Sequence, residues 1–281
     1  RGILRGTGLG ALALGGLATA GALTSFAGPA DAQGITDADI LNFALNLEYL
    51  EAEFYVFATT GHGLPAKDTG GSGGPSGGVT FPSTPPNLSG VVLQYALEIA
   101  ADELDHVLFL RSALGSQAVS EPKIDLDSSF NTLASAAGLP TPFSPYTSNN
   151  NFLLGAYIFE DVGVTAYHGA APLVQNKQIL GAAAGILGTE AYHASEIRLQ
   201  LFQLGQPYWN YSAKISALRA KLSQANDDQG VAVKNMPNIA LTDSNGLVFA
   251  RTPRQVLNIV YAGIGASSGL FYPNGMNGAI K

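Results

Sequence analysis

The chain has 281 residues, of which 46% are hydrophobic and 12% charged, enough for one substantial core with room for long insertions. It has no cysteine, which excludes disulfides, thiolate metal sites, iron–sulfur clusters and c-type haem attachment and leaves oxygen and nitrogen as metal ligands. The net charge is −7 at pH 7 and no two basic residues are adjacent, so nucleic acid is excluded as an expected partner.

Residues 1–33 form a segment that is rich in Gly, Ala and Leu and uncharged between Arg5 and Asp31. Its start is typical of the second half of a twin-arginine export signal, and residues 30–32 offer a small-residue cleavage site. About 25 uncharged residues can also span a hydrocarbon layer as a helix. We therefore expect an export signal or a retained apolar helix, with membrane contact through residues 1–30 and a periplasmic or extracellular location.

The first bundle helix is expected to begin at Asp37 or Asp39, either of which can cap it, and to run to about residue 58. Within it, Tyr55 follows Glu48 by seven residues, which is nearly two helical turns, so both side chains lie on one face. Glu51, one turn after Glu48, lies on the same face and is an alternative to Glu48 as the functional carboxylate of this helix. Residues 59–89 then form a Gly- and Pro-rich insertion, either a flexible linker or an ordered contact loop.

A second helix is expected over about 89–115, and it contains Glu103-Leu104-Asp105-His106. Residues i and i+3 of a helix share a face, so Glu103 and His106 can direct a carboxylate and an imidazole at one point. Residues 116–150 are then the long crossover that lets the third helix run parallel to the second.

The third and fourth helices repeat this chemistry. Over about 151–172, Glu160 precedes Tyr167 by seven residues, and over about 174–204 the second Glu-x-x-His is formed by Glu190 and His193. The pattern is an internal duplication of a helix pair. Four converging carboxylates without a cation would lose several kcal/mol per ion in hydration, so the pattern predicts two divalent metal ions. His62 lies at the start of the insertion and is expected to be structural or solvated, and His168 falls off the ligand stripe by one residue and is expected to be a helix-surface or core histidine.

The order and spacing of these residues resemble the ferritin-like superfamily of di-iron and di-manganese carboxylate proteins. Residues 39–48, 160–167 and 271–278 resemble the desiccation-related ferritin-like domain proteins, and the resemblance covers the chain from about residue 35 to its end. It implies an all-α, ferritin-like four-helix bundle with a carboxylate-rich centre, to which the sequence adds long loop insertions and an apolar N-terminal helix. By position, it implies six metal ligands: Glu48, Glu103, His106, Glu160, Glu190 and His193. It also makes Asp102 a candidate for orienting an imidazole, whereas Thr189 fills the equivalent place in the second motif.

The expected domains are residues 1–33, a bundle over 34–205 and a C-terminal extension over 206–281. In the extension we expect an amphipathic helix near 212–224 and a short helix that starts with Thr252 as its cap and Pro253 at its first position. The final Gly-, Asn- and aromatic-rich residues are suited to packing over a surface or a neighbouring subunit.

Two functional hypotheses follow from these observations. The first is an exported, stress-protective protein with two Fe or Mn ions that acts on O₂ or peroxide. In this hypothesis Tyr55 and Tyr167 relay protons or electrons, and the alternative for each tyrosine is a packing role. The second is a non-enzymatic structural or assembly subunit that uses the bundle as a scaffold. The low charged fraction, about half of the usual ~25%, favours a homo-oligomer or a larger assembly.

Overall fold

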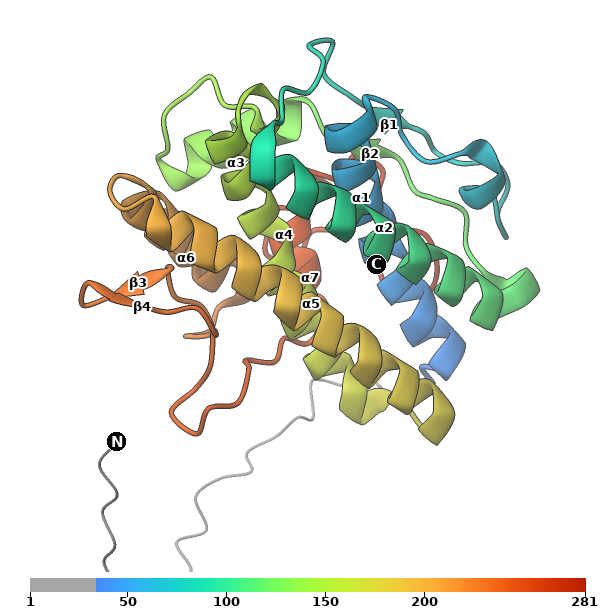
Figure 1. Cartoon of the computed structure of the whole chain (residues 1–281). Helices are drawn as coiled ribbons and strands as arrows, with labels where there is room; N and C mark the ends of the chain where they lie inside the picture. The colour runs from blue at the N-terminus through green and yellow to red at the C-terminus, as the bar shows by residue number, and fades with distance from the viewer. Residues whose placement is uncertain (1–33) are drawn as a thin grey trace, which may run out of the picture. The chain divides into compact units, whose positions relative to one another are not determined.

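The computed structural model describes residues 34–281, so the predictions for residues 1–33 lie outside the described residues. Four long helices form the bundle: α1 (Asp37–Thr60), α2 (Gly90–Leu114), α4 (Asn149–Ala170) and α5 (Lys177–Gln203). Figure 1 shows α2 and α5 in front of α1 and α4. The predicted all-α four-helix bundle is confirmed.

The start of α1 differs from the prediction in its capping residue. Thr36 is the cap: its hydroxyl accepts a hydrogen bond from the Asp39 amide, while the Asp39 carboxylate accepts one from the Thr36 amide. This reciprocal pair satisfies two amide groups that the helix itself leaves without partners. Asp37 instead accepts hydrogen bonds from the amides of Gln175 and Asn176, at 2.8 and 2.9 Å. It therefore joins the start of α1 to the start of α5.

The pair α1 and α4 and the pair α2 and α5 differ in how much of their surface is covered by the rest of the chain. α1 and α4 are buried on nearly every side over their middle turns, whereas α2 and α5 are buried along one stripe only. The cover on α1 and α4 comes from the loop insertions and the C-terminal extension. The bundle is therefore open to solvent along the outer face of α2 and α5.

The insertion at 59–89 is an ordered contact loop rather than a free linker. It contains β1 (Val79–Thr80), which pairs in parallel with β2 (Ile124–Asp125) of the crossover. A Cβ atom at Gly71 would lie 2.4 Å from the Ala118 carbonyl oxygen, so only glycine allows this close approach. The crossover also holds α3 (Ser128–Ala137), a helix that the sequence analysis did not predict. Short 3₁₀ helices lie at η1 (Ala66–Asp68), η2 (Gly115–Gln117), η3 (Pro145–Thr147) and η4 (Ala171–Leu173).

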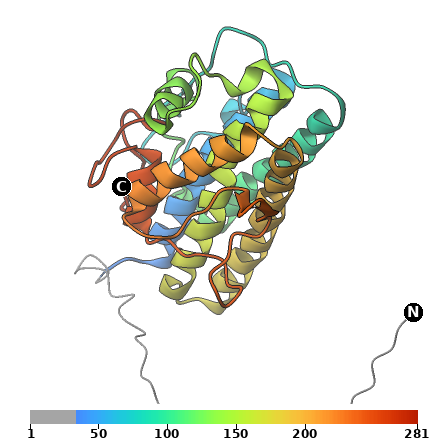
Figure 2. The same ribbon diagram turned by 90° about the vertical axis from the view of Figure 1, so that its left-hand side faces the viewer.

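The C-terminal extension packs back on the bundle. It comprises α6 (Tyr208–Ser223), the antiparallel pair β3 (Ala232–Val233) and β4 (Met236–Pro237), and α7 (Pro253–Val260). Figure 2 shows α6 crossing the bundle beside the red segment that contains α7. Thr252 caps α7 with Pro253 at its first position, as predicted. In the final residues the Tyr272 hydroxyl donates to the Asn46 carbonyl of α1 at 2.7 Å, so the tail is fixed to the bundle.

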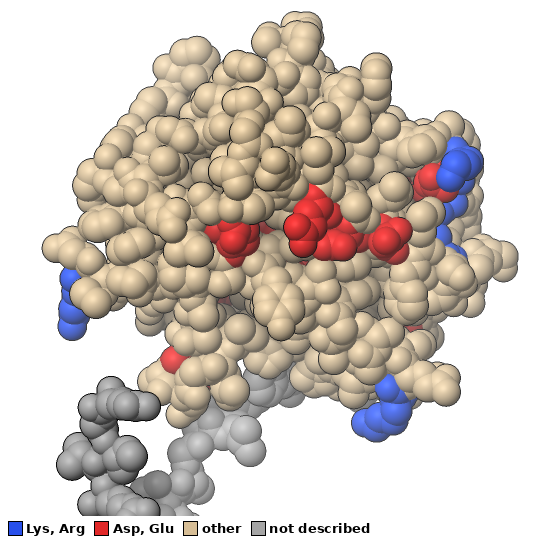
Figure 3. Space-filling model, viewed as in Figure 1, with Lys and Arg blue, Asp and Glu red and all other residues tan. Residues whose placement is uncertain are grey.

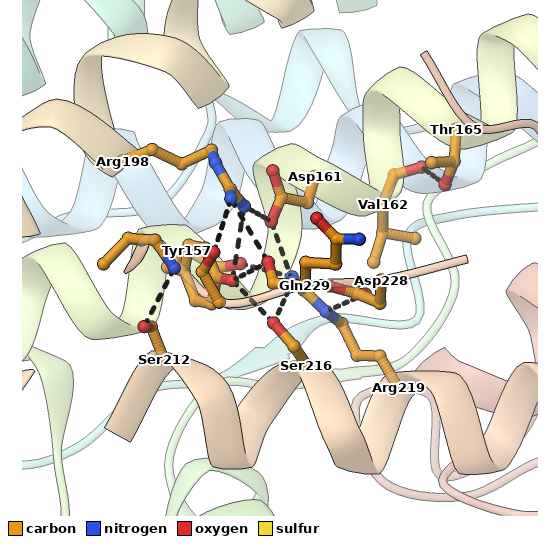
Figure 4. Close-up of polar contacts among 12 residues, drawn as sticks. Tyr157, Asp161, Val162, Thr165, Arg198, Ser212, Ser216, Arg219, Asp228 and Gln229 are labelled. Carbon is orange, nitrogen blue, oxygen red and sulfur yellow. Dashed lines mark hydrogen bonds and ion pairs between the residues drawn. The ribbon is translucent and has the colours of Figure 1, made fainter. Parts of the chain in front are cut away.

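A buried network of ion pairs fixes the extension to α4 and α5 (Figure 4). Asp161 of α4 accepts from Arg198 of α5 at 2.8 Å and from Arg219 of α6 at 2.7 Å. The network continues through Asp228 to Arg251, whose Nη2 lies 2.8 Å from the Asp228 carboxylate. The charges balance, because Asp227 pairs with Arg251 as the third carboxylate.

Within residues 34–281, no helix combines the length and the apolar character that a membrane crossing requires.

Candidate metal centre

The six ligand positions predicted from sequence converge in the core between the four helices. Their ligand atoms form two groups in which all atoms lie within 4.8 Å of one another. One group contains Glu48, Glu103, His106 and Glu190, and the other contains Glu103, Glu160 and His193. Glu103 belongs to both groups, so its carboxylate lies between them.

The first group surrounds Nδ1 of His106. This nitrogen lies 3.2 Å from Glu48 Oε2, 3.5 Å from Glu103 Oε2 and 3.6 Å from Glu190 Oε1. The three carboxylates come from α1, α2 and α5, and their side chains are fully buried. His106 itself is buried, so the group is closed to bulk water on most sides.

The second group surrounds Nδ1 of His193, which lies 3.0 Å from Glu103 Oε1 and 3.6 Å from Glu160 Oε2. The other ring nitrogen, Nε2, lies 3.1 Å from the Asp102 carboxylate. A carboxylate on the far nitrogen fixes the orientation of a ligating imidazole and raises its basicity. Asp102 is thus placed as the resemblance implied.

The centre is arranged with an approximate two-fold symmetry that follows the sequence duplication. The Tyr55 hydroxyl of α1 donates a hydrogen bond to Glu160 of α4, and the Tyr167 hydroxyl of α4 donates one to Glu48 of α1. The Glu of each helix thus meets the Tyr that follows the Glu of the other helix by seven residues, which makes α1 and α4 antiparallel. The same exchange relates the two Glu-x-x-His pairs of α2 and α5.

Two positions break this symmetry. Asp102 supports His193, but the equivalent position beside His106 is Thr189, whose hydroxyl contacts the Gly185 carbonyl of its own helix. Glu51 stands one turn after Glu48, and the equivalent residue one turn after Glu160 is Gly163. A Cβ atom at Gly163 would lie 2.1 Å from Glu190 Oε2 and 3.3 Å from Glu51 Oε1, so the glycine leaves room for both carboxyl groups.

The pKa values of the ligand candidates show how bound protons offset the negative charge of the site. Burial raises the pKa of Glu48 to about 7 and that of Glu160 to about 8. Burial alone would lower the pKa of both imidazoles, but their carboxylate neighbours raise it, to about 11 for His106 and about 9 for His193. Burial opposes the effect at Glu103, yet contacts with the two imidazoles lower its pKa to about 2. Protonated imidazoles therefore compensate the shared carboxylate.

The donor atoms fit a pair of metal ions. Among the residues that the structure describes, six ligand atoms are buried without a hydrogen-bond partner: both oxygens of Glu103 and of Glu190, Oε2 of Glu160 and Nδ1 of His193. His193 Nδ1 is close to Glu103, but the angles are not those of a hydrogen bond. Buried polar atoms without partners cost about 1–3 kcal/mol each, and a hard or borderline cation would satisfy several at once.

The other sequence candidates lie elsewhere. Glu51 is buried but belongs to neither ligand group. His62 is exposed, and the half-buried His168 has Nδ1 2.8 Å from the Val248 carbonyl oxygen of the extension, so both are structural or solvated as expected.

A solvent-exposed groove of about 390 Å³, which was not predicted from the sequence, reaches the centre between α2 and α5. Its lining includes Tyr95, Glu98, Tyr192, Glu196 and the ligand candidate His193. Figure 3 shows carboxylates in a row across the middle of this side of the molecule, with Lys and Arg only near its edges. We call the exposed and half-exposed acids of the two helices the acidic face: Glu98, Asp102, Asp105 and Glu196. Helical spacing could have indicated it, because the three members on α2 recur at intervals of three and four.

Comparison with known proteins agrees with this geometry. Two curated proteins are similar over most of their length. The "Ferritin-like catalase Nec2" of Nesocodon mauritianus is 30% identical over 276 residues, which cover 89% of this chain and 87% of the relative. The "Desiccation-related protein PCC13-62" of Craterostigma plantagineum is 32% identical over 267 residues, which cover 86% of this chain and 83% of the relative. A family model described as "Ferritin-like domain" matches residues 36–203, and the chain belongs to this family.

Proposed function

We propose that the protein holds two divalent ions, iron or manganese, at this centre and uses them to convert two molecules of hydrogen peroxide into two of water and one of dioxygen. The observation that carries the proposal is the set of buried, unpartnered oxygen and nitrogen atoms arranged about the shared Glu103 carboxylate. The similarity to a protein named a ferritin-like catalase supports the choice of peroxide among the reactions of such centres.

Each of the six ligand candidates would have a distinct role in holding the ions. Glu103 would bridge the ions, His106 and His193 would bind one each, and Glu48, Glu160 and Glu190 would complete their surroundings. The metal pair, when bound, would supply the two electrons that one peroxide takes up and the other gives back.

Tyr55 and Tyr167 hold the carboxylates of Glu160 and Glu48 in place and keep a proton beside each of them. Burial raises the pKa of Tyr55 and of Tyr167 well above 10, and the nearby carboxylates raise it further. Both phenols therefore remain protonated donors to Glu160 and Glu48. We propose that these phenols orient Glu160 and Glu48 toward the centre and hold a proton within hydrogen-bond reach of each carboxylate.

Elemental analysis of the purified protein tests the proposal first, followed by oxygen release from peroxide after loading with Mn²⁺ or Fe²⁺. Glu103→Ala removes the shared carboxylate, so we expect loss of bound metal, of oxygen release and of some thermal stability. Asp105→Asn is the matched control, because Asp105 lies two residues away but is exposed, and it should retain all three.

Equal metal content and melting temperature in Glu103→Ala and the native protein would contradict the metal site. Bound metal without any turnover would instead support the second hypothesis, a scaffold in which the ions only stabilise the bundle.

We also propose export, a role in stress protection, and assembly into an oligomer. The apolar sequence of residues 1–30 and the low charged fraction support export and assembly, and the similarity to a protein named desiccation-related supports the stress role. Cell fractionation and light scattering of the full chain would check location and assembly.

A further inference from the structure

A second route to the centre lies on the covered side of the bundle. It is an apolar cavity of about 80 Å³ between α1, α3, α4, α6 and α7. Its walls are almost wholly aliphatic or aromatic, and three polar residues reach it: Thr132, Arg219 and Glu51. The Thr132 hydroxyl donates to the Ser128 carbonyl and Arg219 is held in the buried ion-pair network, which leaves Glu51 as the polar group without a partner.

The burial of the wall residues rises from one end of the cavity to the other. Ala136 and Ala262 are exposed and Leu222 is half-buried, so these residues mark the outer end. Leu50 and Phe159 are buried and line the deep part. The cavity therefore extends from near the surface, where α3 and α6 face each other, toward the middle of α1 and α4.

The deep end meets the metal-binding carboxylates. Glu51 and Gly163 both line the cavity, and a Cβ atom at Gly163 would be 2.1 Å from Glu190 Oε2. The Glu51 carboxyl approaches the same point, the residue as a whole is 4% exposed, and within residues 34–281 its carboxyl has no hydrogen-bond partner. The absence of a side chain at Gly163 thus leaves the cavity in contact with the centre.

The size and lining of the cavity select its occupant. A volume of this order holds a few small molecules but no larger organic substrate. Hydrogen peroxide would lose its hydrogen bonds against apolar walls, whereas dioxygen has none to lose. The groove on the acidic face offers peroxide a polar path instead.

We propose that this cavity is a passage for dioxygen between the surface and the metal centre. Glu51 is the residue that separates the deep end of the cavity from the centre. The inference deepens the proposed function, because dioxygen is the product of peroxide breakdown and the oxidant of a reduced metal pair.

Xenon tests the passage without depending on turnover. It is apolar, comparable in size to a small gas molecule, and it occupies dry protein cavities. In crystals of the full chain under xenon pressure, we expect xenon density among Leu50, Val162 and Ile215. No xenon density there overturns the proposal, while metal content and peroxide turnover are measured separately and decide the proposed function.

A pair of neighbouring variants tests access from outside. Ala136→Trp places a bulky ring at the outer end, whereas Ser135→Trp adds the same ring to the next exposed residue of α3, which does not line the cavity. With the protein loaded with Fe²⁺, we expect slower oxidation by dissolved dioxygen in Ala136→Trp and the native rate in Ser135→Trp. Equal rates in both variants and the native protein overturn the passage even if xenon binds.

Discussion

At the scale of single residues, the centre depends on one glycine. Gly163 occupies the position that corresponds to Glu51 in the repeated helix pair, and the space above it is taken by carboxyl oxygens from α1 and α5. A repeated sequence has therefore diverged at this point so that one half supplies a carboxyl group and the other supplies the room for it.

Gly163→Ala should therefore reduce metal binding while leaving the bundle folded. The new methyl group would lie 2.1 Å from Glu190 Oε2 and must push that carboxylate out of place. Gly185→Ala is the matched control, because a Cβ atom there meets nothing within 4 Å. It should keep full metal content and gain up to about 1 kcal/mol from helix propensity. Metal content by mass spectrometry and unfolding by denaturant check both, and native metal content in Gly163→Ala would contradict this account.

The protonation of the site makes a prediction about pH. Folded-state pKa values of about 7 for Glu48, about 8 for Glu160 and about 9 for His193 exceed the ordinary values of 4.5 and 6.5. The metal-free folded protein thus binds more protons than the unfolded chain, and its stability falls as the pH rises from about 5 to about 9. Metal ions need the deprotonated ligands, so metal affinity rises over the same range. The melting temperatures of loaded and metal-free protein should diverge as the pH rises, and convergence would argue against coordination by these residues.

At the scale of elements, the buried ion pairs decide how the C-terminal extension holds the bundle. Asp161 follows the ligand candidate Glu160 directly, so the arginines of α5 and α6 that bind Asp161 also fix this turn of α4. The Arg219 guanidinium also lies over the Tyr157 ring, 4.6 Å from its centroid. The extension thus acts on the site through the backbone of one helix.

Arg219→Leu should destabilise the protein by about 3–5 kcal/mol, because it leaves Asp161 and Asp228 as poorly compensated buried charges. Lys67→Ala removes a largely exposed cation from its pair with the buried Asp68, and because water screens the lysine it should cost less, about 1 kcal/mol. The free energies of unfolding of the two variants, measured by chemical denaturation, give the comparison. Similar midpoints for both would show that the network adds little to stability.

At the scale of the whole molecule, the sequence was sufficient for the bundle and for the convergence of the six ligand candidates. Helical spacing alone places Glu103 beside His106, and the repeat predicts which helices face each other. The capping residue Thr36 and helix α3 were missed because both depend on local hydrogen bonds that several neighbouring residues could make. The network around Arg219 and the two routes to the centre could not be read from spacing, because they depend on how the extension approaches α4.

The two routes to the centre should also differ in what they attract. The acidic face concentrates cations beside His193, and this attraction is weakened by salt. Replacing both Glu98 and Glu196 by Gln should slow Mn²⁺ loading by up to roughly tenfold at low ionic strength without changing the final stoichiometry. Asp243→Asn, which removes a half-exposed charge from the C-terminal extension, should load at the native rate. Stopped-flow measurement of loading checks this, and an unchanged rate in the double variant would exclude entry by this face.

The broken two-fold symmetry has a consequence for how the centre fills. Two identical half-sites could not distinguish the first ion from the second, and a mixture of two elements would occupy them at random. Here one imidazole has Asp102 behind it and the other does not, and the extra carboxyl of Glu51 has no counterpart at Gly163. We therefore expect stepwise loading, with the singly occupied protein carrying its ion in the half supported by Asp102. A heterobimetallic pair would then adopt one arrangement rather than two.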